Sequence, residues 1–166
     1  MASPEGGVQP KAASKEAGMA SGTSPDELTV NITQEIHVRA SLENTFAALV
    51  EQLEDNDTPE GNKLPMKLEA WPGGRWYRDL GDGNGHLWAH VQAIKRPTLL
   101  EFYGPLFMSF AVISNVQYRL SEMDGGTLIK FQHKAFGAIP DDYKQGISKG
   151  WTHIHARVLA RAEKKR

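Results

Sequence analysis

The chain has 166 residues, a formal net charge of -1 and no cysteine. This length allows one well-buried domain, and the near-zero charge gives no electrostatic case for binding nucleic acid. Without cysteine, disulfides, thiolate zinc sites, iron–sulfur clusters and a cysteine nucleophile are excluded, and the absence fits a cytoplasmic location.

The N-terminal segment, residues 1–27, is rich in Ala, Ser, Gly, Pro and charged residues. Such a composition buries too little apolar surface to offset the entropy lost on ordering, so we expect a disordered tail. It has no apolar stretch typical of a secretory signal, and nothing later is long and apolar enough to span a membrane. Residues 28–166 are predicted to form a single domain that does not insert into a membrane.

The first ordered elements are a predicted strand over residues 28–40 and a predicted helix over residues 41–53. Apolar residues alternate with polar ones in the first segment, which is the pattern of a half-buried strand. In the second segment the apolar residues lie at helical spacing and Ser41 is a suitable N-cap. Residues 54–63 are polar and predict a loop.

Between residues 64 and 135 the sequence predicts short strands broken by Gly and Pro. Near the end of this region apolar and polar residues alternate over 114–120 and again over 127–133, on either side of the turn residues Asp124-Gly125-Gly126. Strands joined by tight turns favour an antiparallel meander of about six strands.

The last predicted element is a long amphipathic helix that begins near Asp141. Its apolar residues recur at steps of three or four: Tyr143, Ile147, Trp151, Ile154, Val158 and Ala162. Gly146 and Gly150 each cost roughly 1 kcal/mol inside a helix. We expect them either to break the helix or to let it approach the sheet closely.

This order of elements predicts an α+β fold, in which about seven strands form a curved antiparallel sheet around the C-terminal helix. One or two short helices would follow the first strand. A sheet with one apolar face needs a cover, and the last helix has the matching apolar stripe. A curved sheet wrapped over a helix often leaves a cavity between them.

The glycine-rich stretch "GDGNG" (residues 81–85) resembles a nucleotide or calcium loop only superficially. It lacks the G-x-G-x-x-G spacing and is followed by a strand pattern, whereas a phosphate loop leads into a helix. Counted from Asp82, the twelfth position is Ala93, where an EF-hand requires glutamate. The stretch therefore predicts a hairpin, with Trp76 and Trp88 on its two arms.

No local motif identifies an enzyme, a metal site or a cofactor. His86 and His90 would lie about 13 Å apart on a strand, and His153 and His155 fall on different faces of a helix. No G-x-S-x-G elbow is present. His133 is predicted to face the interior, either as a hydrogen-bonded core histidine or as a polar group that orients a ligand or moves a proton.

The apolar stretch "YGPLFMSFAVI", residues 103–113, joins two predicted strands. It is either a connection with buried side chains or a mobile loop at the mouth of a cavity. In the second case Phe107 and Phe110 would contact an apolar ligand.

Several stretches together resemble the SRPBCC (START or birch-pollen-allergen-like) superfamily. The nearest branch is the group of small bacterial proteins related to the C-terminal domain of the heat-shock-protein-90 ATPase activator. The residues that carry this resemblance are Arg39-Ala40-Ser41, Phe46, Pro72-Gly73-Gly74-Arg75, Val91 with Pro97, Gly125-Gly126-Thr127 and Gly150-Trp151. Together they cover residues 29 to about 163.

The resemblance implies the helix-grip fold and a cavity for an apolar or amphipathic molecule, since relatives include lipid carriers, hormone receptors and polyketide cyclases. Fold does not fix function. Three functions remain open: a binding or carrier protein, a cyclase- or hydratase-like enzyme using His133, and a chaperone-associated interaction module with a protein partner. The chaperone activator has a docking domain where this chain has only a low-complexity tail.

The leading expectation is a small hydrophobic or amphipathic ligand held between the sheet and the C-terminal helix. We expect the side chains that line this site to be inward-facing aromatic residues and one histidine. The predicted ligand-binding residues are Trp76, Trp88, Phe102, Phe107, Phe110, Tyr118, Phe131, His133 and Trp151.

Overall fold

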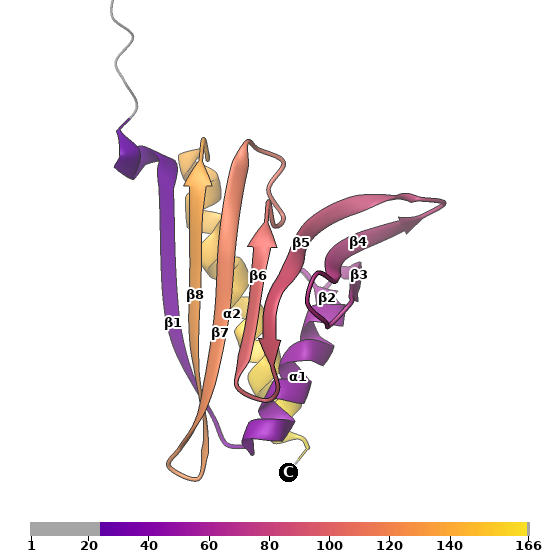
Figure 1. Cartoon of the computed structure of the whole chain (residues 1–166), viewed down its shortest axis with the longest axis vertical. Coiled ribbons are helices and arrows are strands. Elements are labelled where there is room, and N and C mark those ends of the chain that lie inside the picture. The colour runs from indigo at the N-terminus through magenta and orange to yellow at the C-terminus, as the bar shows by residue number, and fades with distance from the viewer. Residues whose placement is uncertain (1–23, 166) are drawn as a thin grey trace, which may run out of the picture.

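A computed structural model describes residues 24–165, in which one curved antiparallel sheet packs against two helices (Figure 1). The sheet has eight strands in the order β1-β8-β7-β6-β5-β4-β3-β2. The elements are η1 (Pro25–Leu28), β1 (Thr29–Val38), α1 (Leu42–Glu54), β2 (Asp55–Asp57), β3 (Lys63–Leu68), β4 (Arg75–Gly81), β5 (Asn84–Lys95), β6 (Leu99–Gly104), β7 (Val112–Met123), β8 (Gly126–Gly137) and α2 (Asp141–Glu163). The predicted α+β class and the long C-terminal helix are confirmed.

One detail of the predicted architecture was wrong. The sheet has eight strands because residues 55–57, predicted as part of a loop, form β2 and pair with β3. One helix, the 13-residue α1, follows the first strand, in agreement with the predicted one or two. Its start is as predicted, since the Ser41 hydroxyl accepts a hydrogen bond from the backbone N–H of Asn44 at 3.2 Å.

The predicted tail reached residue 27, and residues 1–23 of it lie outside the described part of the chain. Residues 25–28 form the short 3-10 helix η1. The Ser24 hydroxyl accepts from the backbone N–H of Glu27, and the Glu27 carboxylate accepts from the backbone N–H of Ser24, so a capping box fixes its start.

Alternation sets which face of each strand is buried, as predicted. On β8, Ile129, Phe131 and His133 are buried, while Lys130 and Lys134 are exposed. β8 pairs with both β1 and β7, which places the first strand beside the last and completes the inner face.

The inner face of the sheet is covered by α2, which lies behind β6, β7 and β8 in Figure 1. Its buried residues are Ile147, Trp151, Ile154, His155, Val158 and Ala162. Tyr143, counted in the predicted stripe, is 43% exposed because it lies beyond the sheet-facing turns. Across residues 24–165, no helix is both long and apolar enough to cross a membrane.

Neither expectation for Gly146 and Gly150 is correct. α2 is continuous from Asp141 to Glu163, so neither glycine breaks it. A Cβ atom added at either position would meet no heavy atom within 4 Å outside the local helix backbone. The glycines therefore leave open space beside the helix and are not required for close packing.

The short strand β2 is held to α2 by charged side chains. Asp57, which is almost fully buried, accepts from the Arg157 guanidinium and lies 3.0 Å from Nε2 of His153. The hydrogen bond from Arg157 lowers the pKa of the Asp57 carboxyl. These contacts explain why a three-residue polar segment forms a strand.

The hairpin of β4 and β5 curves away from α2, and its tip projects from the body of the protein (Figure 1). Its two turn residues, Asp82 and Gly83, have φ angles of 51° and 76°. A tight two-residue hairpin turn of this kind requires a positive φ at both central residues. The predicted hairpin is confirmed.

Candidate functional site

Seven of the nine predicted ligand-binding residues form one chain of aromatic rings between the sheet and α2. Neighbouring ring centroids in this chain are 4.7 to 6.0 Å apart, close enough for edge-to-face or tilted contacts. In order of contact the rings are Phe102, Trp76, Trp88, Phe107, Trp151, Phe131 and Tyr118. We call this set the aromatic cluster.

The cluster joins two parts of the interior. Trp76 and Phe102 come from β4 and β6, while Phe131 comes from β8 and Trp151 from α2. Phe107 links the two parts, because its ring lies 5.6 Å from Trp88 and 6.0 Å from Trp151. In this structure the rings contact one another, and Phe107 occupies the position where the two parts meet.

His133 faces the interior, as predicted, and is fully buried. Trp151 Nε1–H donates to its Nδ1 at 2.9 Å, and its Nε2 lies 3.0 Å from the Ser114 hydroxyl. Since an indole only donates, Nδ1 must be the unprotonated nitrogen and Nε2–H the donor to Ser114. Burial lowers the pKa of His133 to about 4, so the ring is neutral.

His155 is a second buried histidine, which the sequence analysis did not select. Its Nδ1 lies 2.6 Å from Oε1 of Gln34, and its Nε2 lies 3.2 Å from the hydroxyl of Tyr118. Burial lowers its pKa to about 3 and raises that of Tyr118 well above its usual range. The available signal was its spacing, four residues after Trp151 and hence on the same helix face.

A pocket of about 280 Å³ opens at the surface next to Trp88 and Phe107. It lies between residues 85–88 of β5 and residues 106–109 of the loop that joins β6 to β7. We call this the mouth pocket. It is the place where the aromatic cluster meets solvent.

The loop over the mouth pocket, residues 105–111, is fixed at one point by a strained residue. Leu106 has a φ angle of 60°, which is uncommon for a residue other than glycine. Its backbone N–H donates to the carbonyl oxygen of Trp88 at 2.6 Å, so the loop is attached to β5. Strain of this kind is frequent at segments that move or bind ligands.

Phe110 does not join the aromatic cluster. It is half-buried and its ring contacts Tyr143 near the start of α2, with centroids 4.9 Å apart. The structure therefore separates Phe110 from the other predicted ligand-binding residues and places it on the outer part of the loop.

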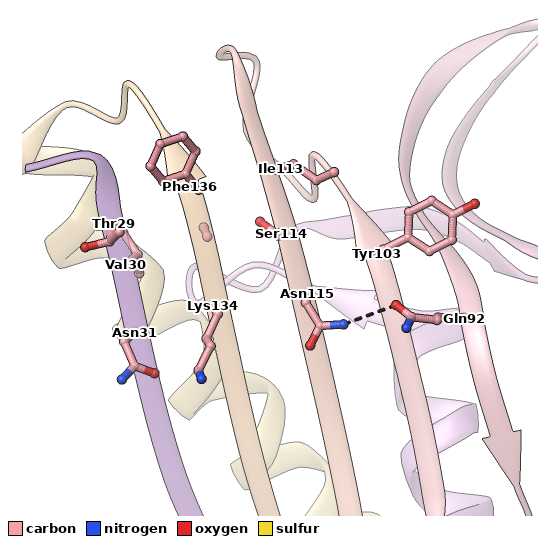
Figure 2. A pocket seen from close by; sticks show the side chains of 11 residues that line it. Thr29, Val30, Asn31, Gln92, Tyr103, Ile113, Ser114, Asn115, Lys134 and Phe136 are labelled. Carbon is pink, nitrogen blue, oxygen red and sulfur yellow. Dashed lines mark hydrogen bonds between the residues drawn. The ribbon is translucent and has the colours of Figure 1, made fainter. Parts of the chain in front are cut away.

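A larger pocket, of about 460 Å³, lies on the opposite, outer face of the sheet (Figure 2). Three exposed apolar side chains from neighbouring strands line it: Tyr103, Ile113 and Phe136. Ile113 and Phe136 are direct cross-strand partners. None of the nine predicted ligand-binding residues lines this pocket.

No protein-family model and no curated protein matches the chain, but many solved structures do. Ara h 8.0201 has a TM-score of 0.60 at 17% identity, over 82% of this chain and 99% of its own. The protein CV1439 from Chromobacterium violaceum has a TM-score of 0.63 at 16% identity, over 80% of this chain and 96% of its own.

The di-domain ARO/CYC StfQ, from the steffimycin biosynthetic pathway, has a TM-score of 0.60 at 13% identity. The match covers 85% of this chain and 53% of StfQ, so this chain spans about half of that protein. At such identities these likenesses show a shared arrangement of sheet and helices, and they carry no residue role across.

Proposed function

Because the chain has the helix-grip fold of the SRPBCC superfamily, we propose that it binds a small apolar or amphipathic molecule between the sheet and α2. The observation that carries this proposal is the position of Phe107. Its ring lines the mouth pocket and touches both Trp88 and Trp151.

Binding requires Phe107 to leave its position. Phe107 is only half-buried and sits on a loop, whereas Trp76, Phe102 and Trp151 are fully buried on strands or helix. Loop segments open at lower free energy than packed core elements. A ligand ring or chain that replaced Phe107 would gain the contacts with Trp88 and Trp151 that Phe107 now makes.

The proposal is tested by replacing Phe107 and measuring apolar ligand binding. Phe107→Ala removes the ring that competes with the ligand, so the apparent affinity for 1-naphthol should rise in a fluorescence or calorimetric titration. It also leaves an apolar space that small aromatic molecules can fill. Met123→Ala, at an exposed residue at the opposite end of β7 from this loop, is the matched control and should leave the affinity unchanged.

An unchanged affinity in Phe107→Ala would contradict this route into the interior. Failure of native mass spectrometry and thermal-shift assays to detect any fatty acid, flavonoid or polyketide bound to the unchanged protein would count against the binding function itself.

An acid–base role for His133 has less support. Both of its ring nitrogens already have partners, Trp151 and Ser114, and burial keeps the ring neutral. A substrate could reach a ring nitrogen only by displacing one of these hydrogen bonds. A His133→Ala variant that lost turnover of a bound molecule while retaining its binding would restore the enzyme hypothesis.

A protein-interaction module is the second candidate, because one specific observation favours it. Ile113 and Phe136 are 61% and 54% exposed and adjoin Tyr103 in the outer pocket (Figure 2). Exposed apolar side chains in contact on a sheet face are a common feature of interaction surfaces. The chaperone-activator branch and the cytoplasmic location stay predictions.

This second candidate has its own test. A photo-crosslinking residue placed at Ile113 should give one discrete protein adduct in cells, and Phe136→Asp should abolish it. The same residue at Arg119, which is exposed lower on β7, should give no adduct. Equal labelling at both positions would indicate random collisions and reject the interaction surface.

A further inference from the structure

An arginine, Arg78 of β4, lies on the inner face of the sheet beside the aromatic cluster. Register shows this directly, since Arg78 is the cross-strand partner of Met66, and Trp76 is the partner of Leu68. Met66, Leu68 and Trp76 are all buried on the inner face. Paired residues share a face, so Arg78 follows Trp76 by one step towards the tip of the hairpin.

Among the described residues, no side chain pairs with the charge of Arg78. Its Nε is buried and has no hydrogen-bond partner. Within residues 24–165 its guanidinium makes neither an ion pair nor a side-chain hydrogen bond, whereas Arg75, three residues earlier, binds Glu69 through two nitrogens. A buried donor without an acceptor is costly, and a bound group that supplies the acceptor is one explanation for it.

Neither cross-strand partner of Arg78, Met66 on β3 or His86 on β5, carries a carboxylate. Its partner across the β4–β5 pair is His86, which lines the mouth pocket together with Trp88 and Phe107. The next carboxylate along β4, Asp79, pairs with Lys67 on the outer side. A positive charge thus lies one step along β4 from Trp76 of the aromatic cluster, and its cross-strand partner on β5 lines the mouth pocket.

We propose that the bound molecule is an anionic amphiphile, with one carboxylate or phosphate group held by Arg78 and an apolar body lying against Trp76, Trp88 and Trp151. This inference rests on the proposed function and names the chemical class of its ligand. The planar guanidinium binds a carboxylate or phosphate through two parallel hydrogen bonds, and its Nε–H gains the acceptor that it lacks.

A purely structural role for Arg78 makes a different prediction. Its aliphatic stem could serve to cover Met66 and Trp76 while its charge stays in water. In that case the charge of the ligand would not matter, and replacing Arg78 would change the stability of the protein but not its choice among ligands.

The test uses three molecules with the same twelve-carbon tail, namely dodecanoate, 1-dodecanol and dodecyltrimethylammonium, titrated below their aggregation concentrations. We expect the unchanged protein to bind dodecanoate most tightly and dodecyltrimethylammonium most weakly. Arg78→Gln should weaken dodecanoate binding by roughly 10- to 100-fold and leave 1-dodecanol binding within about twofold. Arg119→Gln, on the exposed outer face, is the matched control and should change neither affinity.

The outcomes separate this inference from the proposed function. Equal affinity for dodecanoate and 1-dodecanol, or an equal loss of both in Arg78→Gln, overturns the anionic class and leaves apolar binding standing. Binding of none of the three overturns both. If Arg78→Gln does not fold, the relative affinities of the unsubstituted protein for the three probes still test whether the ligand is anionic.

Discussion

The indole Nε1–H of Trp151 donates to Nδ1 of His133 at 2.9 Å, and this bond joins α2 to β8 in the middle of the interior. Both residues are fully buried. The bond fixes the tautomer of His133 and the orientation of the largest ring on α2. It thereby positions the Trp151 ring that Phe107 and Phe131 contact.

Replacing Trp151 should lower the stability of the protein, because it removes this hydrogen bond. Trp151→Phe leaves Nδ1 of His133 buried without a donor, so we expect the free energy of unfolding to fall by about 1–3 kcal/mol from the lost bond alone. Chemical denaturation measures the change. Trp71→Phe, at a tryptophan that is 58% exposed, should change stability by less than about 0.5 kcal/mol.

The two buried histidines should make the protein sensitive to mild acid. Their folded pKa values, about 4 for His133 and about 3 for His155, lie below the ordinary value of 6.5. Below pH 6.5 the unfolded chain takes up protons that the folded chain does not, so stability is complete above pH 6.5 and declines towards pH 4.

Denaturation midpoints measured between pH 7.5 and 4.5 check this expectation. Carboxyl groups with lowered pKa values, such as that of Asp55 at about 2, affect stability only as the pH nears their ordinary values, 3.8 for Asp55, so the first part of the decline below pH 6.5 belongs to the histidines. His155→Gln should flatten the pH dependence by about half, because one of the two histidines is removed. His37→Gln, at an exposed histidine of β1, should leave the slope unchanged.

The glycines of α2 allow a stabilising substitution. Gly146→Ala should raise the free energy of unfolding by roughly 1 kcal/mol, because the helix is continuous and the new methyl group meets no neighbour. Gly104→Ala is the contrasting variant. Its φ angle is 154° and its Cβ would lie 2.5 Å from the carbonyl oxygen of Trp88, so it should destabilise the protein.

Much of the fold was predictable because hydrophobic periodicity is a local property. Alternation placed Phe131 and His133 on the inner face of β8, and helical spacing placed Trp151 on the buried side of α2. Strand β2 was not predictable in this way. It contains no apolar residue, and its position depends on the contacts of Asp57 with Arg157 and His153, which are about 100 residues away.

The inward positions of the aromatic residues and of His133 were predictable, whereas those of Arg78 and His155 were not. Period-two spacing from Trp76 also places Arg78 inward, but an arginine on a strand ordinarily indicates a solvent-facing position. The burial of His155 was not predicted for a similar reason. It depends on hydrogen bonds of its ring nitrogens with Gln34 and Tyr118. The packing of Phe107 between two tryptophans required the three-dimensional structure.

The most direct test of ligand binding between the sheet and α2 follows the four indole N–H signals by two-dimensional NMR during a titration with dodecanoate. Trp76, Trp88 and Trp151 belong to the aromatic cluster, whereas the exposed Trp71 lies outside it. We expect saturable shifts of the Trp88 and Trp151 signals, with the Trp71 signal unchanged. Shifts confined to Trp71, or no shift of any indole signal at saturating dodecanoate, would contradict binding in the interior.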